Sequence, residues 1–435
     1  MTRSPIRIPP DRDLSIDFIR ALCLPVVVVL HAIQMGIEGD PPRAVNALAE
    51  WAPLAGITWI GMIMPTFFVA GGFAGITTWR RLQQRGETAG EYIRVRALRL
   101  ARPVLLAMLG VLAALAIMAM SGEDPEFLRS FAFRLAEPLW FIAVYAICTS
   151  FVPLMAWLHR RAAWATYFGL AALVVVIDLL VRFADAPVGA LNWLFVWLFV
   201  QQLGFGVRDQ WYSRRPRGVL LALAVVAYAL MGVAVLGMGY DPDMLANLNP
   251  PTALLLLLGL AQVYLFTIVQ PAIRALMRWR PALLVIGTLG MYGMVIYLWH
   301  TVAMAVVVGA QQMLGLPFPP LLSSVWWTTR IPWVLAIVVV VAGFCAVVPR
   351  LERLWPGERS RPMPLWAAAT ATALLVGSVG WVLTQGYLTP GTVVALAGLA
   401  IAIGWLTVGG PGRNGSLAIL EDASTPAALR DDRRL

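Results

Sequence analysis

DRDLSIDFIRALCLPVVVVLHAIQ, residues 11–34, is the stretch of sequence that decides the fold. Its apolar part is about 20 residues long, enough for a helix to cross the ~30 Å hydrocarbon core of a bilayer. Similar runs recur as far as residue 410, and the chain of 435 residues is 60% hydrophobic and only 13% charged. A soluble domain carries about a quarter charged residues. The composition therefore predicts an all-α, polytopic transmembrane helical bundle.

Hydropathy and loop residues together predict about twelve membrane spans. They are expected near residues 16–36, 56–79, 103–120, 138–158, 163–182, 187–207, 218–238, 252–273, 282–311, 330–349, 364–384 and 391–410. Residues 1–15 and 411–435 are polar segments outside the spans, and we expect the second of them to be a disordered tail.

Arginine predicts how the bundle is oriented. The chain contains no lysine, so its net charge of +10 comes from arginine alone. The absence of lysine also excludes lysine Schiff-base chemistry. With the N-terminus inside, the inner loops hold most arginines and the outer loops keep only Arg43, Arg129, Arg134, Arg182 and Arg330. Positive charge favours cytoplasmic loops. We therefore expect both termini in the cytoplasm, a multi-pass protein of the inner membrane with the lipid bilayer around it, and no nucleic-acid partner.

The first span contains ionisable residues, which are costly in hydrocarbon and therefore functional candidates. Arg20 and His31 are eleven residues apart, which puts them within about 20° of one helix face and ~16 Å apart along the axis. Asp17 lies three residues before Arg20 and can pair with it. Pro25 removes one backbone hydrogen bond between them. The alternative is that Arg20 extends to the inner interface and His31 is a hydrogen-bonded core residue.

The other two histidines differ in their expected positions. His300, in MYGMVIYLWHTVAM, lies about as deep as His31, in the outer half of the membrane, so a shared site is possible if their helices are neighbours. His159 is expected at the inner surface without a role. Trp326 and Trp327 fit an outer aromatic belt. The three cysteines are far apart in apolar runs, so no metal site is indicated.

An ordered set of short motifs runs through residues 12–349. It consists of Arg20 and His31 with ten residues between them, MPTFFVAGGFAG (64–75), the stretch with Arg94, Arg96, Arg99, Arg102 and Pro103, PLWFIAVY (138–145) and YLWH (297–300). Together these motifs resemble the membrane-bound acyltransferase-3 family. The resemblance implies a ten-span core over residues 16–349, with two additional helices in 350–410. Gly71 stands where the family usually has serine, so no hydroxyl role is carried over to it.

The resemblance also implies an activity and a site. Members of the family transfer an acyl group, often acetyl, from a cytoplasmic acyl-CoA to a hydroxyl or amine of an envelope glycan, a glycolipid or a secreted small molecule. By this resemblance His31 acts as general base or forms an acyl-histidine, with Arg20 at the channel mouth and Asp17 orienting it. The arginines expected to attract the phosphates of coenzyme A are Arg96, Arg99 and Arg102. The residues expected to bind the acceptor are Tyr297, His300, Trp140 and Glu137.

Two other classes of protein remain open at this point. A transporter or flippase could use Arg20, Asp17 and the amides inside the spans to bind a polar substrate without chemistry. A structural scaffold or sensor would show no turnover. Transfer of label from acetyl-CoA separates an enzyme from both alternatives.

Overall fold

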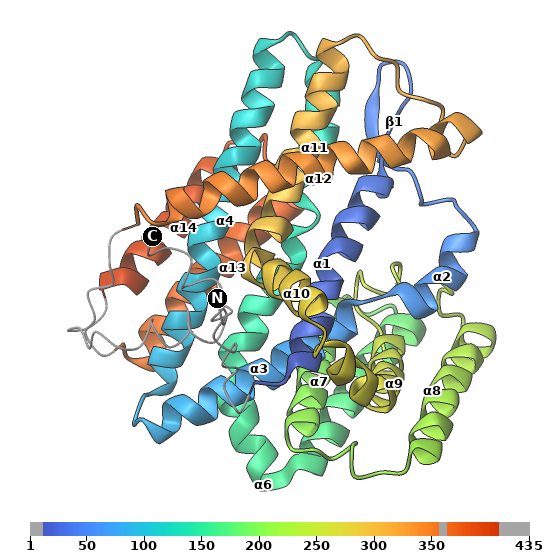
Figure 1. Cartoon of the computed structure of the whole chain (residues 1–435), viewed down its shortest axis with the longest axis vertical. Helices are drawn as coiled ribbons and strands as arrows, with labels where there is room; N and C mark the ends of the chain where they lie inside the picture. The colour runs from blue at the N-terminus through green and yellow to red at the C-terminus, as the bar shows by residue number, and fades with distance from the viewer. Residues whose placement is uncertain (1–11, 356–362, 409–435) are drawn as a thin grey trace, which may run out of the picture.

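In the computed structural model, eleven helices of the described residues, 12–355 and 363–408, are long and apolar enough to cross a membrane (Figure 1). The expectation of an all-α polytopic bundle is confirmed. Most of the predicted N-terminal segment and the whole predicted C-terminal tail lie outside the described residues.

The helices follow one another with short connections. They are α1 (Leu14–Gln34), α2 (Pro53–Gly61), α3 (Met64–Gln84), α4 (Ala89–Met120), α5 (Pro125–Ala136), α6 (Leu139–Ala184), α7 (Asn192–Arg208), α8 (Arg217–Met238), α9 (Leu254–Leu276), α10 (Arg280–Met291), α11 (Gly293–Met313), α12 (Ser324–Glu352), α13 (Leu365–Gln385) and α14 (Gly391–Val408). A 3-10 turn, η1 (Gly189–Leu191), precedes α7.

Three of the predicted spans differ in continuity from the observed helices. The spans expected at 138–158 and 163–182 form one element, α6, whose 46 residues bend at Ala162, where φ is −155° and ψ is 60°. At 1.5 Å per residue α6 is about 69 Å long, enough for two crossings. The span expected at 282–311 is broken at Tyr292 into the short helix α10 and the longer α11.

Helix α1 lies among other helices rather than at the edge of the bundle. The carboxylate of Asp13 accepts a hydrogen bond from the backbone N–H of Ser15 at 3.0 Å and so caps its first turn. Along its length α1 contacts α3, α9, α10, α11 and α12. The residues of its polar face therefore meet protein on several sides.

Helices α3 and α7 pack at unusually short range because glycines face each other. A side-chain carbon at Gly72 would lie 2.0 Å from the backbone oxygen of Gln201, and one at Gly204 would lie 2.0 Å from that of Val69. Only glycine fits at either position. The MPTFFVAGGFAG stretch thus serves helix packing.

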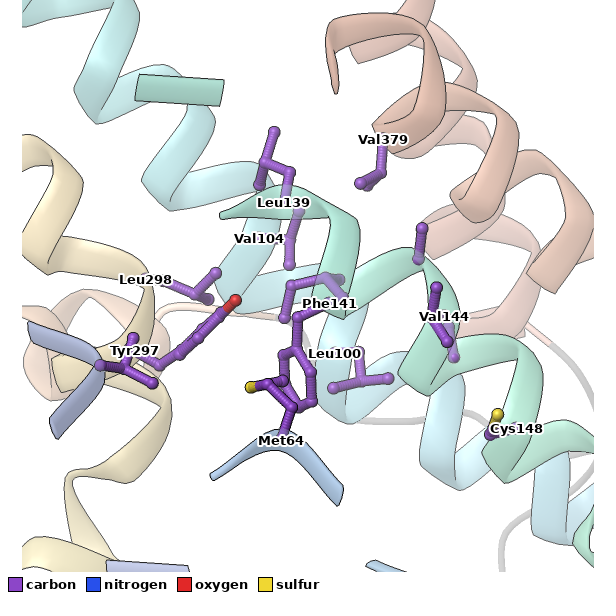
Figure 2. Close-up of a cluster of buried hydrophobic side chains, with 14 of the residues drawn as sticks. Met64, Leu100, Val104, Leu139, Phe141, Val144, Cys148, Tyr297, Leu298 and Val379 are labelled. Carbon is purple, nitrogen blue, oxygen red and sulfur yellow. The ribbon is translucent and has the colours of Figure 1, made fainter. Parts of the chain in front are cut away.

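A buried apolar cluster holds the central helices together. Figure 2 shows Met64 of α3, Leu100 and Val104 of α4, Phe141 of α6 and Tyr297 of α11 converging. Their burial from water and lipid joins elements that are far apart in the sequence.

One end of α1 continues into a small β-hairpin. Strand β1 (Met35–Glu38) pairs antiparallel with β2 (Arg43–Asn46), and Gly39 begins the turn with a φ of +89°, which favours glycine. The start of α12 lies beside this hairpin (Figure 1). Trp326, expected in an outer aromatic belt, is only 1% exposed because it packs inside this region, so that expectation is wrong.

The two C-terminal helices are packed onto the bundle. Helix α13 contacts α4 and α6, and α14 contacts α4. The guanidinium of Arg94 donates to the backbone oxygen of Leu406 at 3.3 Å, and that of Arg102 donates to the Thr407 hydroxyl at 3.2 Å. These helices therefore hold part of the arginine-rich segment of α4.

Candidate functional site

The structure brings His31 and His300 into direct contact. Their ring centroids are 5.1 Å apart and their planes are inclined by 30°. His31 comes from α1 and His300 from α11, which are neighbouring helices. A shared site for the two histidines required that their helices be neighbours, and the structure shows that they are.

Backbone hydrogen bonds orient both imidazole rings. His31 Nδ1 lies 3.0 Å from the backbone oxygen of Val27, and His300 Nδ1 lies 2.5 Å from that of Tyr297. A carbonyl oxygen only accepts, so Nδ1 carries the proton in each neutral ring and Nε2 keeps a lone pair. His300 Nε2 is buried without a partner among the described residues, whereas His31 is partly exposed. His31 is therefore the less buried of the two rings, and its Nε2 keeps a lone pair.

The ion pairing expected for Arg20 is not observed. Asp17 forms its ion pair with Arg12, at 2.6 Å between Nε and Oδ2, so the expected pairing of Asp17 with Arg20 is wrong. The other carboxylate at the start of α1, Asp13, pairs with Arg274 at 2.5 Å. Among the described residues Arg20 has no hydrogen-bond or ion-pair partner, and its Nε is buried. Within the described residues, the charge of Arg20 is thus available to an anionic ligand.

The expected acceptor residues lie at the junction of α5 and α6 and on α11. The Tyr297 hydroxyl donates to the backbone oxygen of Pro138 at 2.6 Å, and its ring centroid lies 5.9 Å from that of His300. The neighbouring Glu137 is ion-paired with Arg134, one turn earlier. Both polar groups therefore already have protein partners.

Trp140 faces α7 rather than the histidine pair. Its ring centroid lies 5.4 Å from that of Trp193 and 5.8 Å from that of Trp197. Nearby, a side-chain carbon at Gly71 would lie 2.9 Å from Cε2 of Tyr145. The Tyr145 ring occupies the space into which the usual serine of this motif would project.

The arginines expected to bind the donor do not all point the same way. Arg96 Nη2 donates to the Thr78 hydroxyl of α3 at 2.9 Å, and its Nε is buried without a partner among the described residues. Arg102 lies 5.8 Å over the ring of Trp355 and reaches α14, while Arg99 is exposed. Of the three, Arg96 is the one whose hydrogen bond reaches α3, a helix that packs against α1.

The sequence model of the acyltransferase-3 family, described as an acyltransferase domain, matches residues 13–349. The chain belongs to the acyltransferase-3 family. It is a multi-pass membrane acyltransferase, and α13 and α14 lie beyond the matched residues. No curated protein and no solved structure matches the chain.

Two arginines of this acyltransferase were treated in the sequence only as outer-loop charges. Arg134 lies close enough to His31 to interact with it electrostatically. Its spacing of three residues from Glu137 was the sequence signal for the ion pair that these two residues form. Arg330 is 6% exposed inside α12. Sequence offered no sign of its burial, because burial of an arginine near a helix end depends on which helices surround it.

The opposite end of the bundle carries a polar network around Asp209. This carboxylate binds Arg80 at 2.5 Å and lies 3.3 Å from His159, which is 5% exposed rather than at the surface as expected. Burial raises the pKa of Asp209, but its hydrogen bonds with Arg80 and His159 outweigh burial and hold that pKa well below its usual range. The network fixes the junction of α3, α6 and α7.

Within the described ranges, no group of three or more histidine, cysteine or acidic side chains is placed to hold a metal ion. The candidate site consists of side chains on α1 and α11, with His31 and His300 at its centre.

Proposed function

We propose that this acyltransferase moves an acyl group, with acetyl as the first candidate, from cytoplasmic acyl-CoA to a hydroxyl or amine of an envelope glycan, a glycolipid or a secreted small molecule. His31 is the general base. The observation that carries this proposal is the stacking of the His31 ring on His300, with Nδ1 of His31 bonded to a backbone oxygen so that Nε2 keeps a lone pair. Arg20, which has no partner among the described residues, lies eleven residues earlier on the same helix.

The reaction follows from the tautomer of His31. Nε2 takes the proton of the acceptor hydroxyl as its oxygen attacks the thioester carbonyl, because a hydroxyl is a poor nucleophile until it loses that proton. The carbon–sulfur bond then breaks, and the imidazolium returns the proton to the leaving thiolate. The products are an ester and free coenzyme A; an amine acceptor gives an amide by the same steps.

A covalent route uses the same atom. In that route His31 Nε2 attacks the thioester and expels the thiolate, and the acceptor hydroxyl then attacks the acyl-imidazole, which frees Nε2 while the hydroxyl proton passes to the thiolate. The two routes differ in whether a labelled protein can be trapped before acceptor is added.

The donor side rests on the positive charge of arginines near the inner end of the bundle. Coenzyme A carries several phosphates, and Arg20 has no carboxylate partner among the described residues. Arg96 would draw the donor toward α3 and α1, with Arg99 and Arg102 contributing charge at a greater distance. Positive charge on the loops expected in the cytoplasm supports an inner-membrane location for the protein. The nucleotide moiety of the acyl-CoA donor would then stay in the inner aqueous phase.

The decisive experiment compares His31→Ala with a matched change on the same helix. Val29→Ala serves as the control because Val29 is 38% exposed and lies on another face of α1. Purified protein in proteoliposomes receives radiolabelled acetyl-CoA and an envelope extract. We expect His31→Ala to lose at least about 100-fold in transfer, the contribution typical of a general base, and Val29→Ala to keep it.

Each result has a clear meaning. Activity of His31→Ala near that of the wild type removes His31 from the mechanism. Label on the protein in the absence of acceptor favours the acyl-histidine route. Movement of an unmodified substrate across the vesicle membrane, with no label transferred, would make the chain a transporter instead.

A further inference from the structure

Arg330 is a buried cation at the end of the bundle that holds the β-hairpin. It lies in the second turn of α12, which begins where the Ser323 hydroxyl accepts a hydrogen bond from the Trp326 backbone N–H at 3.1 Å. The guanidinium carbon lies 4.8 Å from the ring centroid of Trp326 and 4.7 Å from that of Trp333. Two indole rings thus hold the guanidinium in place.

This cation has no anionic partner in the part of the chain that the structure describes. Its Nη1 contacts only the backbone oxygen of Met35, at 3.4 Å, and its Nε is buried without a partner. Burial of an unpaired charge is costly, so such a group normally has a counter-ion. The guanidinium therefore retains unused capacity to bind an oxyanion.

A cavity adjoins the guanidinium. Its volume is about 10 Å³, roughly the space for one water molecule. Its lining includes Met35 and Ile37 of strand β1, and Phe318 and Pro319 further along the chain. The second pair belongs to the connection between α11 and α12, which contains no helix and can move aside more easily than a packed helix. Two oxygens of a carboxylate or a phosphate suit the planar fork of donors that the guanidinium presents in this otherwise apolar site.

The cavity lies at the C-terminal end of α1, the helix that carries His31, because Met35 at the end of α1 lines it. Met35 follows His31 by four residues, which places the two about 6 Å apart along the chain axis. An acceptor anchored on Arg330 would have to extend along α1 by about one helical turn to reach the level of His31. A single sugar or lipid head group is long enough to cover that rise.

We propose that Arg330 binds a carboxylate or phosphate of the acceptor, so that this acyltransferase selects anionic glycans or glycolipids. The inference rests on the proposed function, since it assigns the acceptor class of the same site. A purely structural role for Arg330, as a cap on the last turn of α1, is the competing explanation. Trp333 already caps that turn, because its Nε1 donates to the backbone oxygen of Ala32 at 3.0 Å.

The first test uses the unaltered protein. An envelope extract is separated by anion exchange into retained and unretained fractions, and each is offered to the protein in proteoliposomes with radiolabelled acetyl-CoA. We expect label in the retained, anionic fraction. Label mainly in the neutral fraction overturns the anionic acceptor and leaves acyl transfer intact, whereas no label in either fraction overturns the proposed function and this inference with it.

Chemical treatment of the retained fraction identifies the anion. Alkaline phosphatase removes phosphate monoesters, and carbodiimide with an amine converts carboxylates to neutral amides. Loss of acceptor activity after one treatment assigns that group. Retention of activity after both treatments contradicts recognition of a terminal oxyanion.

The second test separates binding from stability. For Arg330→Gln we expect the KM for the retained acceptor to rise about tenfold, the equivalent of one charge-assisted hydrogen bond, with kcat little changed. Arg330→Lys keeps the charge and should lose less. Arg129→Gln, at an exposed arginine, is the control. A fall in kcat and thermal stability with KM unchanged would assign Arg330 a structural role only.

Discussion

The glycine contact between α3 and α7 makes Gly72→Ala the most direct test of the packing. The added methyl carbon would lie 2.0 Å from the Gln201 oxygen and 2.9 Å from its carbonyl carbon. Carbon and oxygen approach no closer than about 3.3 Å, so the helices must separate by about 1.3 Å. A backbone carbonyl cannot rotate out of the way as a side chain can.

The expected magnitude follows from two opposing effects. Overpacking costs about 1–3 kcal/mol, while alanine in place of glycine in a helix contributes up to ~1 kcal/mol of stability. We expect Gly72→Ala to lower the free energy of unfolding by about 1–2 kcal/mol. Gly232→Ala in α8 is the matched control, because a carbon there meets nothing within 4 Å, and it should be neutral or slightly stabilising.

Reversible unfolding in mixed micelles, followed by tryptophan fluorescence, measures both variants. The same experiment reports local displacement, because the Phe68 and Trp197 ring centroids are 4.3 Å apart across this interface. Separation of the helices should shift the native emission of Gly72→Ala. Equal stability and identical spectra for the two glycine variants would refute the argument from close approach.

Two further substitutions test the carboxylate of Asp209 and the hydroxyl of Tyr297. The lowered pKa of Asp209 means that its charge stabilises the fold above about pH 4 and loses this effect as the pH falls through the folded-state pKa. Asp209→Asn should therefore be less stable than the wild type at pH 7, with the difference in thermal stability narrowing in acid; a constant difference at all pH values contradicts this. Tyr297→Phe removes the hydrogen bond to Pro138 and should cost about 1 kcal/mol of unfolding free energy. The KM for acceptor should not change, and a marked rise in it would return the hydroxyl to acceptor binding.

Hydropathy predicted the membrane spans well because each span is a property of a continuous stretch. The chemistry of the site depends on which helices are neighbours, and a single sequence does not contain that information directly. His31 and His300 were placed at similar depth, yet only the packing of α1 on α11 shows that they touch. Depth is encoded along one helix, whereas contact depends on two.

The errors have a common physical origin. Asp17 was expected to pair with Arg20 because local spacing was the only available guide, but Arg12 competes successfully for the same carboxylate. Arg330 and Trp326 were assigned to a loop and an interfacial belt from their positions near a span end. The hairpin after α1 and the loop before α12 enclose them, and no local pattern predicts such enclosure.

The hydrogen bonds that join α4 to α14 bear on how this protein can be shortened or grafted. The family match ends at residue 349, so the last two helices look dispensable when sequence similarity is the only guide. Removing them would strip Arg94 and Arg102 of acceptors at Leu406 and Thr407 and uncover an apolar side of α4. The two helices are therefore structural partners of α4, and a chimera that exchanges the core must carry these helices with it.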